Sequence, residues 1–397
     1  MKNIAIISEY NPFHNGHLHQ IQEVKKKHPD STIITIMSGN FVQRGEPAIL
    51  NKYERCKNAI SAGLDLALQI PTIYSLQSAE NFALGSIKIL EELKVVDYLS
   101  FGIESKNFDM LYKIAESQIK NGSLLKDKTS KLMSQGFSYP KALEIATKTL
   151  LNLEFDEFFL SNNILALEYI KSTIRTNSSL KFIPITRVGS NYLTEKIENN
   201  TQPSATAIRK YIYNGKLDSI SKYLPNSTLE SLKSVETSLE YFELIKYVFL
   251  VEDKNLKTIT GYEEGLENLI VKNLKSSNDF KEFIEKSKSK RYKEGRLKRY
   301  ILNCILEISK NLVDDSIEHK PKFVNVLGFN NKGASILKDI SKVSDISLIV
   351  NKRDFNLKDS NSKSLFQLEN KATDLYNIIS GELKSEYQYM PIIQNNK

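Results

Sequence analysis

Cysteine is scarce in this sequence: Cys56 and Cys304 are its two cysteines, and no C-x-x-C pair occurs. Neither a disulfide framework nor a structural zinc site is therefore supported. Long apolar segments are also missing. The chain contains no run of about eighteen apolar residues, and the apolar stretch Ile4–Ile7 soon meets polar residues, unlike a signal peptide. These absences predict a soluble, cytoplasmic protein without a membrane partner.

Several familiar motifs are absent as well. The chain has no Walker A motif, no complete G-x-G-x-x-G and no Ser-His-Asp pattern. P-loop hydrolysis and dinucleotide-dependent redox chemistry are therefore poor interpretations. Internal repeats and low-complexity segments are also lacking, and 397 residues should form two or three domains.

Acidic residues are outnumbered by basic ones, 47 against 55, and the formal charge is +8. This excess favours an anionic partner such as nucleic acid. A lysine-rich composition is also a common genomic bias, so the charge alone does not identify the partner.

The first twenty residues carry the most informative pattern. The apolar run Ile4–Ile7 predicts a buried strand, which Pro12 must interrupt because proline fixes φ and restrains the residue before it. Gly16 stands where a helix would begin. Without a Cβ it lets a bulky anion approach the unpaired N–H groups of the first helical turn, where the helix dipole favours phosphate. The pattern predicts an anion site.

His14 and His17 are spaced so that both project from one face of that first turn. Two imidazoles would then meet one phosphate. An H-x-x-H pair is also found in metal sites and on plain surfaces, and no dedicated carboxylate cage for a metal accompanies it. The preceding strand, the glycine and the amphipathic helix that follows favour the phosphate interpretation.

These residues are part of a longer resemblance. His14-Asn15-Gly16-His17 after a first strand resembles the H-x-G-H signature of the nucleotidyltransferase superfamily, whose Rossmann-like domain binds ATP and directs attack on its α-phosphate. Together with neighbouring stretches, the sequence resembles the bacterial tRNA(Met) cytidine acetate ligase family. The matching stretches are Glu9–His17, Met37–Ala48, Phe101–Glu104, Asn162–Leu165, Ser204–Arg209, Lys290–Tyr292 and Val326–Phe329.

Strand and helix patterns alternate through the first half of the chain. Strands are predicted at Ile4–Ile7, Thr32–Met37, Asp65–Ile70, Val95–Phe101 and Lys181–Arg187. Such alternation predicts an α/β fold with a parallel sheet, here a Rossmann-like nucleotidyltransferase domain at residues 1–225. After residue 225 helical patterns dominate, so residues 226–397 should form a mostly helical C-terminal domain that binds tRNA. Two short strands, Val324–Phe329 and Ile346–Val350, should belong to a small α/β portion near the end.

Ligands of an open parallel sheet lie at the carboxyl ends of the strands. The candidate segments are therefore Ser8–His17, Ser38–Glu46 and Gly102–Glu104. Gly102 would let a base or ribose lie against bare backbone, although it could equally be an ordinary turn glycine. Arg187 ends a strand and suits a phosphate, although a solvated surface arginine is the plainer interpretation.

The resemblance extends the set of site residues. It implies catalytic roles for His14 and His17, and a nucleotide contact for Asn162, which would otherwise be read as a helix N-cap. The ATP-binding residues that it implies are Ile7, Ser8, Glu9, Tyr10, Asn11, Pro12, Phe13, His14, Asn15, Gly16, His17, Leu18, His19, Gln20, Gly102, Asn162 and Arg187.

A second helix start occurs at Ser204–Lys210, where hydroxyl residues precede two cations. It could bind phosphates or be a simple capped helix. Candidate phosphate or acetate contacts are Gln43, Arg44, Ser204, Thr206 and Arg209. Farther along, basic residues cluster between Lys281 and Arg299, with a tyrosine among them. Candidate tRNA contacts there are Lys290, Arg291, Tyr292, Arg296 and Arg299, although such a cluster is often just a solvated helix face.

The resemblance implies an ATP-dependent ligase that converts acetate to acetyl-adenylate and acetylates the wobble cytidine of elongator tRNA(Met), forming N4-acetylcytidine. ATP would be a substrate, with Mg²⁺ expected on the triphosphate. Two other interpretations stay open: a small-molecule adenylyltransferase, and an RNA-binding protein with an inactive nucleotide site.

Overall fold

The fold is built on one mostly parallel sheet, in the order β10-β8-β5-β2-β1-β6-β7, with β9 paired to β8. The computed structural model describes residues 2–154, 157–187, 203–233, 241–289 and 291–395. The strands are β1 (Asn3–Ser8), β2 (Thr32–Ser38), β5 (Leu66–Ile70), β6 (Tyr98–Ile103), β7 (Lys181–Thr186), β8 (Phe323–Asn330), β9 (Ser347–Ile349) and β10 (Ile392–Gln394). The predicted α/β class and the strands expected in the first half are confirmed.

Both faces of the sheet are covered, which explains why its central strands are apolar without alternation. Ile4 and Ile6 of β1 pack on one side with Ile21 of α1 (Asn15–Lys27). Ala5 and Ile7 pack on the other side in the cluster formed with α4 (Ala79–Leu93) and α8 (Ser161–Arg175). Helices α2 (Lys52–Ser61) and α16 (Asn331–Val343) also pack against the sheet. The strand ends are therefore held in a rigid frame.

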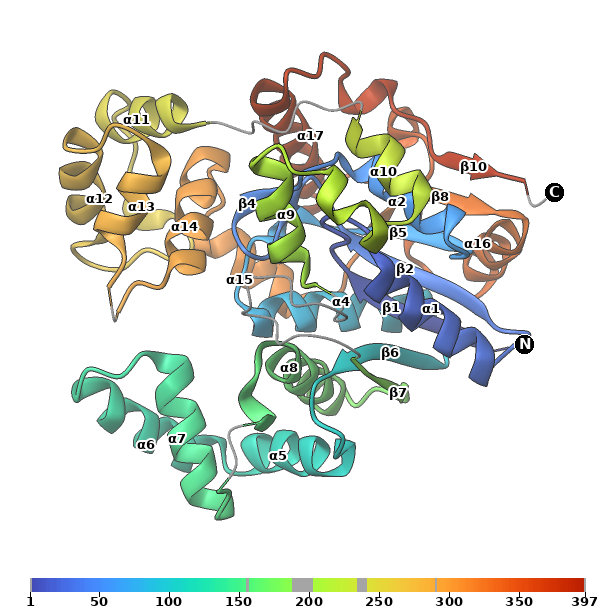
Figure 1. Cartoon of the computed structure of the whole chain (residues 1–397), viewed down its shortest axis with the longest axis horizontal. Helices are drawn as coiled ribbons and strands as arrows, with labels where there is room; N and C mark the ends of the chain where they lie inside the picture. Colours follow the sequence, from blue (N-terminus) through green and yellow to red (C-terminus); the bar gives the residue numbers. More distant parts are fainter. Residues whose placement is uncertain (1, 155–156, 188–202, 234–240, 290, 396–397) are drawn as a thin grey trace.

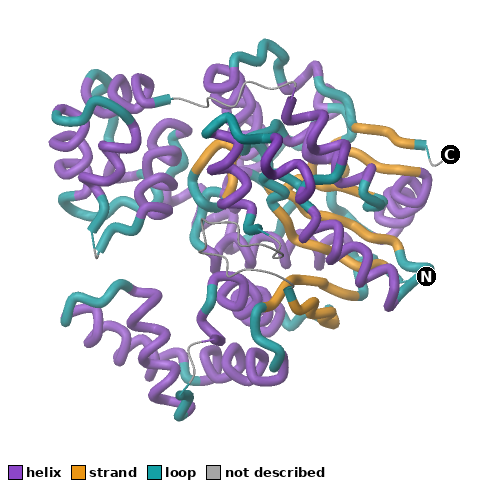
Figure 2. Tube along the Cα trace, in the orientation of Figure 1, coloured by secondary structure: helices purple, strands orange, loops and turns teal. Residues whose placement is uncertain are grey.

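Two groups of helices project from this frame (Figure 1). One group comprises α5 (Phe108–Lys120), α6 (Gly122–Ser134) and α7 (Tyr139–Leu151), and the other comprises α11 (Phe242–Leu250), α12 (Leu266–Lys275), α13 (Phe280–Ser287) and α14 (Glu294–Leu306). Figure 2 shows the strands gathered on the opposite side of the molecule from both groups. The remaining α-helices are α3 (Thr72–Ser75), α9 (Ala205–Tyr213), α10 (Asn226–Lys233), α15 (Lys310–Glu318) and α17 (Ser360–Ser380).

The end of the chain returns to the main sheet. We expected the strands near 324–329 and 346–350 to form a separate small α/β portion, but β8 pairs antiparallel with β5, Leu66 opposite Phe329. The physical reason is burial: Leu66 and Leu68 of β5 are completely buried, and without β8 this apolar strand would be an open edge. The division at residue 225 stays a prediction.

The polar loop expected at residues 38–50 contains a small hairpin, β3 (Phe41–Val42) paired with β4 (Glu46–Pro47). Its Gly45 has φ of +78°, and a Cβ there would lie 2.4 Å from the backbone nitrogen of Arg299 on α14. Only glycine fits, because the left-handed conformation and the close approach both exclude a side chain. The hairpin thus packs directly on the second helical group.

Both cysteines are buried and free. Within the described parts of the chain, no helix combines the length and the apolar character needed to span a lipid bilayer.

Candidate functional site

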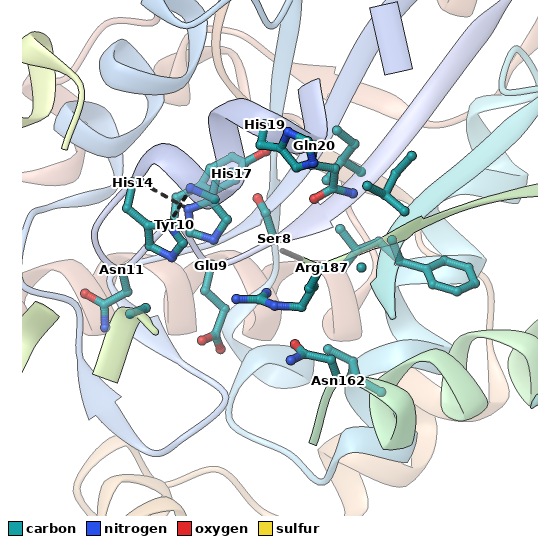
Figure 3. Close-up of a pocket in the computed structure, with 18 of the residues that line it drawn as sticks. Ser8, Glu9, Tyr10, Asn11, His14, His17, His19, Gln20, Asn162 and Arg187 are labelled. Atoms are coloured by element: carbon teal, nitrogen blue, oxygen red, sulfur yellow. Dashed lines mark hydrogen bonds between the residues drawn. The ribbon is translucent and has the colours of Figure 1, made fainter. Parts of the chain in front are cut away.

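A cavity of about 290 Å³ lies at the carboxyl ends of β1, β6 and β7, at the edge where we expected the ligand. Figure 3 shows that its polar side chains come from the turn between β1 and α1, from the first turns of α1, from the end of β7 and from α8. The predicted residues on its wall are Ile7, Ser8, Glu9, Tyr10, Asn11, His14, Gly16, His17, His19, Gln20, Gln43, Arg44, Gly102, Asn162, Arg187 and Arg209.

The two imidazoles are fixed by the start of α1. His14 is the N-cap residue, and its Nδ1 accepts the N–H of Gly16 at 3.0 Å. The Nδ1 of His17 accepts the N–H of His14 at 3.3 Å, and the two rings stack with their centroids 3.8 Å apart. Because each Nδ1 accepts a backbone proton, each neutral ring must carry its own proton on Nε2. The pair therefore has two N–H groups available for an anion.

Both histidines are neutral at physiological pH. Burial lowers the pKa of His14 to about 3, helped by the charges of Arg187 and Arg209. Burial also lowers the pKa of His17 well below its usual value, and His14 and Arg187 add to this effect. The imidazoles can thus bind phosphate as hydrogen-bond donors, while the positive charge comes from arginine.

The lowered pKa of His14 makes the free protein sensitive to acid. Below pH 6.5, His14 of the unfolded chain binds a proton, whereas His14 of the folded chain stays neutral. The free energy of unfolding that His14 contributes above pH 6.5 is therefore lost as the pH falls toward 3. We expect this histidine alone to lower the free energy of unfolding by about 2 kcal/mol between pH 8 and pH 5. Urea unfolding at several pH values measures the loss.

The control for this prediction is His14→Asn, because asparagine is also a good N-cap and does not titrate. Between pH 8 and pH 5, the free energy of unfolding of this variant should fall by about 2 kcal/mol less than that of the natural protein. Parallel stability curves for the two proteins would contradict the prediction.

Three guanidinium groups, those of Arg44, Arg187 and Arg209, reach the cavity wall. Arg209 is 7% exposed. It donates to the carbonyl oxygen of Asn11 at 2.7 Å and pairs with Glu46 at 2.8 Å. The hydrogen bond to Asn11 fixes this cation beside the turn that carries the imidazoles. The cavity is therefore suited to a polyanion.

Gly102 lies on the cavity wall, but the place that we expected a base or ribose to fill is taken by Arg187. A Cβ at Gly102 would lie 3.3 Å from Cγ of Arg187. The glycine lets the methylene groups of the arginine lie against bare backbone, and its guanidinium extends toward Glu9 and the imidazoles (Figure 3).

Asn162 lies in the first turn of α8 and is not its N-cap, which is Leu160. The carboxylate of Glu104 does the capping: it accepts the backbone N–H of Asn162 at 3.1 Å and its side-chain amide at 2.8 Å. Asn163, which the sequence did not single out, is fully buried and accepts the N–H of Glu104 at 2.8 Å. These bonds join β6 to α8 and hold Asn162 on the cavity wall.

Several predicted residues lie away from the cavity wall: Pro12, Phe13, Asn15, Leu18, Ser204 and Thr206. Phe13 is buried, its ring centroid 4.9 Å from that of Tyr10. Ser204 caps α9 by accepting the N–H of Ala207 at 3.2 Å. These two residues support the site by packing and capping.

One wall of the cavity is apolar, and the sequence did not reveal it. It is formed by Phe82, Phe101, Leu165 and Tyr169, which pack in one hydrophobic cluster. Such residues are indistinguishable in sequence from ordinary core positions, since their only signal is hydrophobicity. A flat aromatic ligand such as a nucleobase suits this wall.

Part of the basic cluster near residue 290 is packed into the fold, and its contact with tRNA stays a prediction. Tyr292 is only 7% exposed, so most of its ring is packed inside the protein. Arg299 is half-buried and donates to the carbonyl oxygen of Gln43 at 3.0 Å. Arg291 and Arg296 are more exposed, and both pair with Glu263. The tyrosine and Arg299 thus hold the helices together, and Lys290 lies outside the described residues.

Among the described residues, metal ligands do not gather at this site. In the part of the chain that the structure describes, no group of three or more His, Cys, Asp or Glu side chains could hold a metal ion. Of the residues described on the cavity wall, Glu9 alone has a carboxylate.

Comparison with known proteins places the chain among nucleotidyltransferases. The model of the HIGH Nucleotidyl Transferase family matches residues 1–389. A tRNA(Met) cytidine acetate ligase of Clostridium perfringens (strain ATCC 13124) is 38% identical over 99% of this chain and 100% of its own. One from Thermoanaerobacter sp. (strain X514) is 38% identical over 94% of each chain.

Two crystal structures of Thermotoga maritima TmcAL resemble the fold closely. The apo form has a TM-score of 0.92 and the form bound with alpha-thio ATP a TM-score of 0.88. Each is 27% identical in sequence and covers 100% of both chains.

Proposed function

The chain belongs to the tRNA(Met) cytidine acetate ligase family of HIGH nucleotidyl transferases, and on this premise we propose that it activates acetate with ATP and acetylates the wobble cytidine of elongator tRNA(Met). One observation carries the proposal: two neutral imidazoles, each with its Nδ1 bonded to backbone, stand at the helix start beside three arginines. The nucleotide-bound form of TmcAL, which shares the fold, supports ATP as the nucleotide.

In the first half-reaction, an acetate oxygen attacks the α-phosphorus of ATP, and the bond from this phosphorus to the bridging oxygen breaks. Acetyl-adenylate and pyrophosphate result. The Nε2–H groups of His14 and His17 donate to phosphate oxygens as negative charge moves toward the leaving group, and Arg187 and Arg209 neutralise the rest. Catalysis of this kind consists mainly of positioning and charge stabilisation.

In the second half-reaction, the N4 amine of cytidine attacks the acetyl carbon. A carbon–nitrogen bond forms, the carbon–oxygen bond to the phosphate breaks, AMP leaves and the nitrogen loses one proton. N4-acetylcytidine is the product.

The residues that line the cavity indicate where the adenine ring and magnesium would bind. The adenine ring would lie on the apolar wall, with Asn162 and Gly102 at its border. Magnesium would arrive on the triphosphate, held by phosphate oxygens and water, since the described residues offer it no cage. Its chemistry there would be neutralisation of phosphate charge.

The test of the proposal is incubation with labelled acetate, ATP and bulk tRNA, followed by nucleoside analysis, in parallel with acetate-dependent exchange between ATP and pyrophosphate. We expect label in N4-acetylcytidine and exchange that requires acetate. Exchange that requires another metabolite would favour a small-molecule adenylyltransferase. Absence of exchange with any acyl donor, together with tRNA binding, would favour an RNA-binding protein with an inactive nucleotide site.

The tRNA must approach the open side of the cavity, and a basic surface lies beside it. Lys216 precedes η2 (Asp218–Tyr223), the segment after α9, and Lys222 lies within it; both lysines are exposed. The carbonyl oxygen of Lys222 accepts the side-chain amide of Asn15 at 2.9 Å, and its Nζ lies 5.0 Å from the ring of Tyr223. This surface adjoins the start of α1, so we propose that it contacts the RNA backbone together with Arg291 and Arg296.

Charge reversal tests this surface. In the double variant Lys216→Glu and Lys222→Glu, we expect tRNA affinity to fall about tenfold or more at low salt. The slope of log affinity against log salt concentration should decrease by the amount that corresponds to one or two phosphate contacts. Acetate-dependent exchange should change far less, because no RNA takes part. Titration of labelled tRNA at several salt concentrations measures the effect.

Lys342→Glu on α16 is the matched control, since Lys342 is an exposed lysine elsewhere on the surface, with its side chain 72% exposed. The surface assignment fails if the control and the double variant weaken tRNA binding equally.

A further inference from the structure

The cavity wall includes a carboxylate that the adenylation step does not use. Glu9 follows β1, and its Oε1 accepts the backbone N–H of Gln43 at 2.6 Å. No described residue donates a hydrogen bond to its Oε2. In the view of Figure 3, the side chain extends away from the two imidazoles into the space bordered by Asn11, Arg187 and Asn162. One oxygen is thus held in place and the other faces the cavity.

A carboxylate in this position gives no help to the first half-reaction. Acetate and ATP are both anions, and a third anion beside them opposes their approach. Burial raises the pKa of Glu9, an effect that Arg44 and Arg209 oppose. The group therefore has a greater affinity for a proton than an ordinary glutamate does.

The second half-reaction needs such a group, because the amine must lose a proton when it becomes an amide. The imidazoles of His14 and His17 are poorly placed to take it: each Nδ1 already accepts a backbone N–H, and each Nε2 bears a proton. His19 also lines the cavity, but in Figure 3 it lies beside Gln20, on the side of α1 away from Glu9.

We propose that Glu9 is the general base of acetyl transfer, accepting through Oε2 the proton that the cytidine amine releases. As the nitrogen bonds to the acetyl carbon, its proton passes to Oε2, and the electron pair of the breaking carbon–oxygen bond leaves with AMP. The protonated carboxyl then returns its proton to solvent. This inference rests on the proposed function and assigns different residues to its two halves: imidazoles and arginines to adenylation, Glu9 to transfer.

Glu9→Gln is the decisive variant. Glutamine has the same shape, and its amide oxygen can still accept the N–H of Gln43, but it cannot act as a base. We expect single-turnover transfer from acetyl-adenylate to tRNA to fall about 100-fold or more. Acetate-dependent exchange between ATP and pyrophosphate should fall much less than transfer does. Glu9→Asp keeps a carboxylate and should recover part of the transfer rate.

Glu23→Gln on α1 is the control, because this glutamate does not line the cavity. A loss of exchange equal to the loss of transfer in Glu9→Gln would overturn the inference, since it would mean that Glu9 positions ATP. A selective loss of transfer in His19→Gln, with transfer intact in Glu9→Gln, would also overturn it. Should Glu9→Gln fail to fold, equal losses of exchange and transfer in Glu9→Asp would count against it. Failure of the unaltered protein to exchange with acetate would instead refute the proposed function.

Discussion

Replacing His17 by alanine is expected to slow acetate-dependent exchange between ATP and pyrophosphate by about 100- to 1,000-fold. Removal of one preorganised donor to a developing negative charge typically costs this much in kcat. The structure gives a reason to expect the full effect. The Nδ1 of His17 accepts the backbone N–H of His14, so the ring is held with Nε2–H toward the cavity, and alanine offers no replacement donor.

Two polar substitutions distinguish the roles of the two ring nitrogens of His17. Glutamine places an amide near the position of Nε2 and should recover part of the exchange rate, whereas asparagine mimics only Nδ1 and should behave like alanine. The affinity for tRNA should be unchanged in all three variants. An unchanged exchange rate in His17→Ala would remove the imidazole from the chemistry.

Lys52→Met is expected to lower the free energy of unfolding by about 3–5 kcal/mol, the typical cost of removing one partner of a buried ion pair. Lys52 Nζ lies 2.8 Å from Glu386, and both side chains are 1% exposed. The lysine also donates to Gln69 at 3.1 Å. Methionine fills a similar volume, but it leaves Glu386 buried with only Lys352, at 3.7 Å, as a cation.

Lys371→Met provides the matched control for this prediction. Lys371 pairs with Glu307 on the surface, where the two side chains are 42% and 51% exposed. Loss of an exposed pair should change stability by less than about 1 kcal/mol. Guanidinium unfolding of both variants measures the difference, and equal small losses would show that the buried pair adds nothing to stability.

The parts of the site that depend on residues close together in the sequence could be predicted. A β-branched strand, a proline and a glycine fix the start of α1, and the ends of parallel strands meet at one edge, so His14, Gly102 and Arg187 could be placed near one another. Local rules do not reveal hydrogen-bond partners. That His14 uses Nδ1 to cap α1, and is thereby limited to one tautomer, depends on its geometry.

Other features depend on distant packing. Nothing near Tyr292 in the sequence indicates that its ring is buried. The strand β8 has a clear apolar pattern, yet the pattern does not say which strand it pairs with, because an edge more than 250 residues earlier provides the partner. Capping of α8 by Glu104 joins two segments far apart in sequence. Such contacts are set by the whole fold.

The backbone of Gln43 is bonded to two different parts of the protein. Its N–H is bonded to Glu9 and its carbonyl oxygen to Arg299, while the neighbouring Gly45 leaves no space against α14. A single residue thus connects the helix bearing Arg296 to the carboxylate in the cavity. A shift of α14 would therefore act directly on the backbone segment that holds Oε1 of Glu9 in place, because Arg299 on that helix and Glu9 are bonded to the same residue.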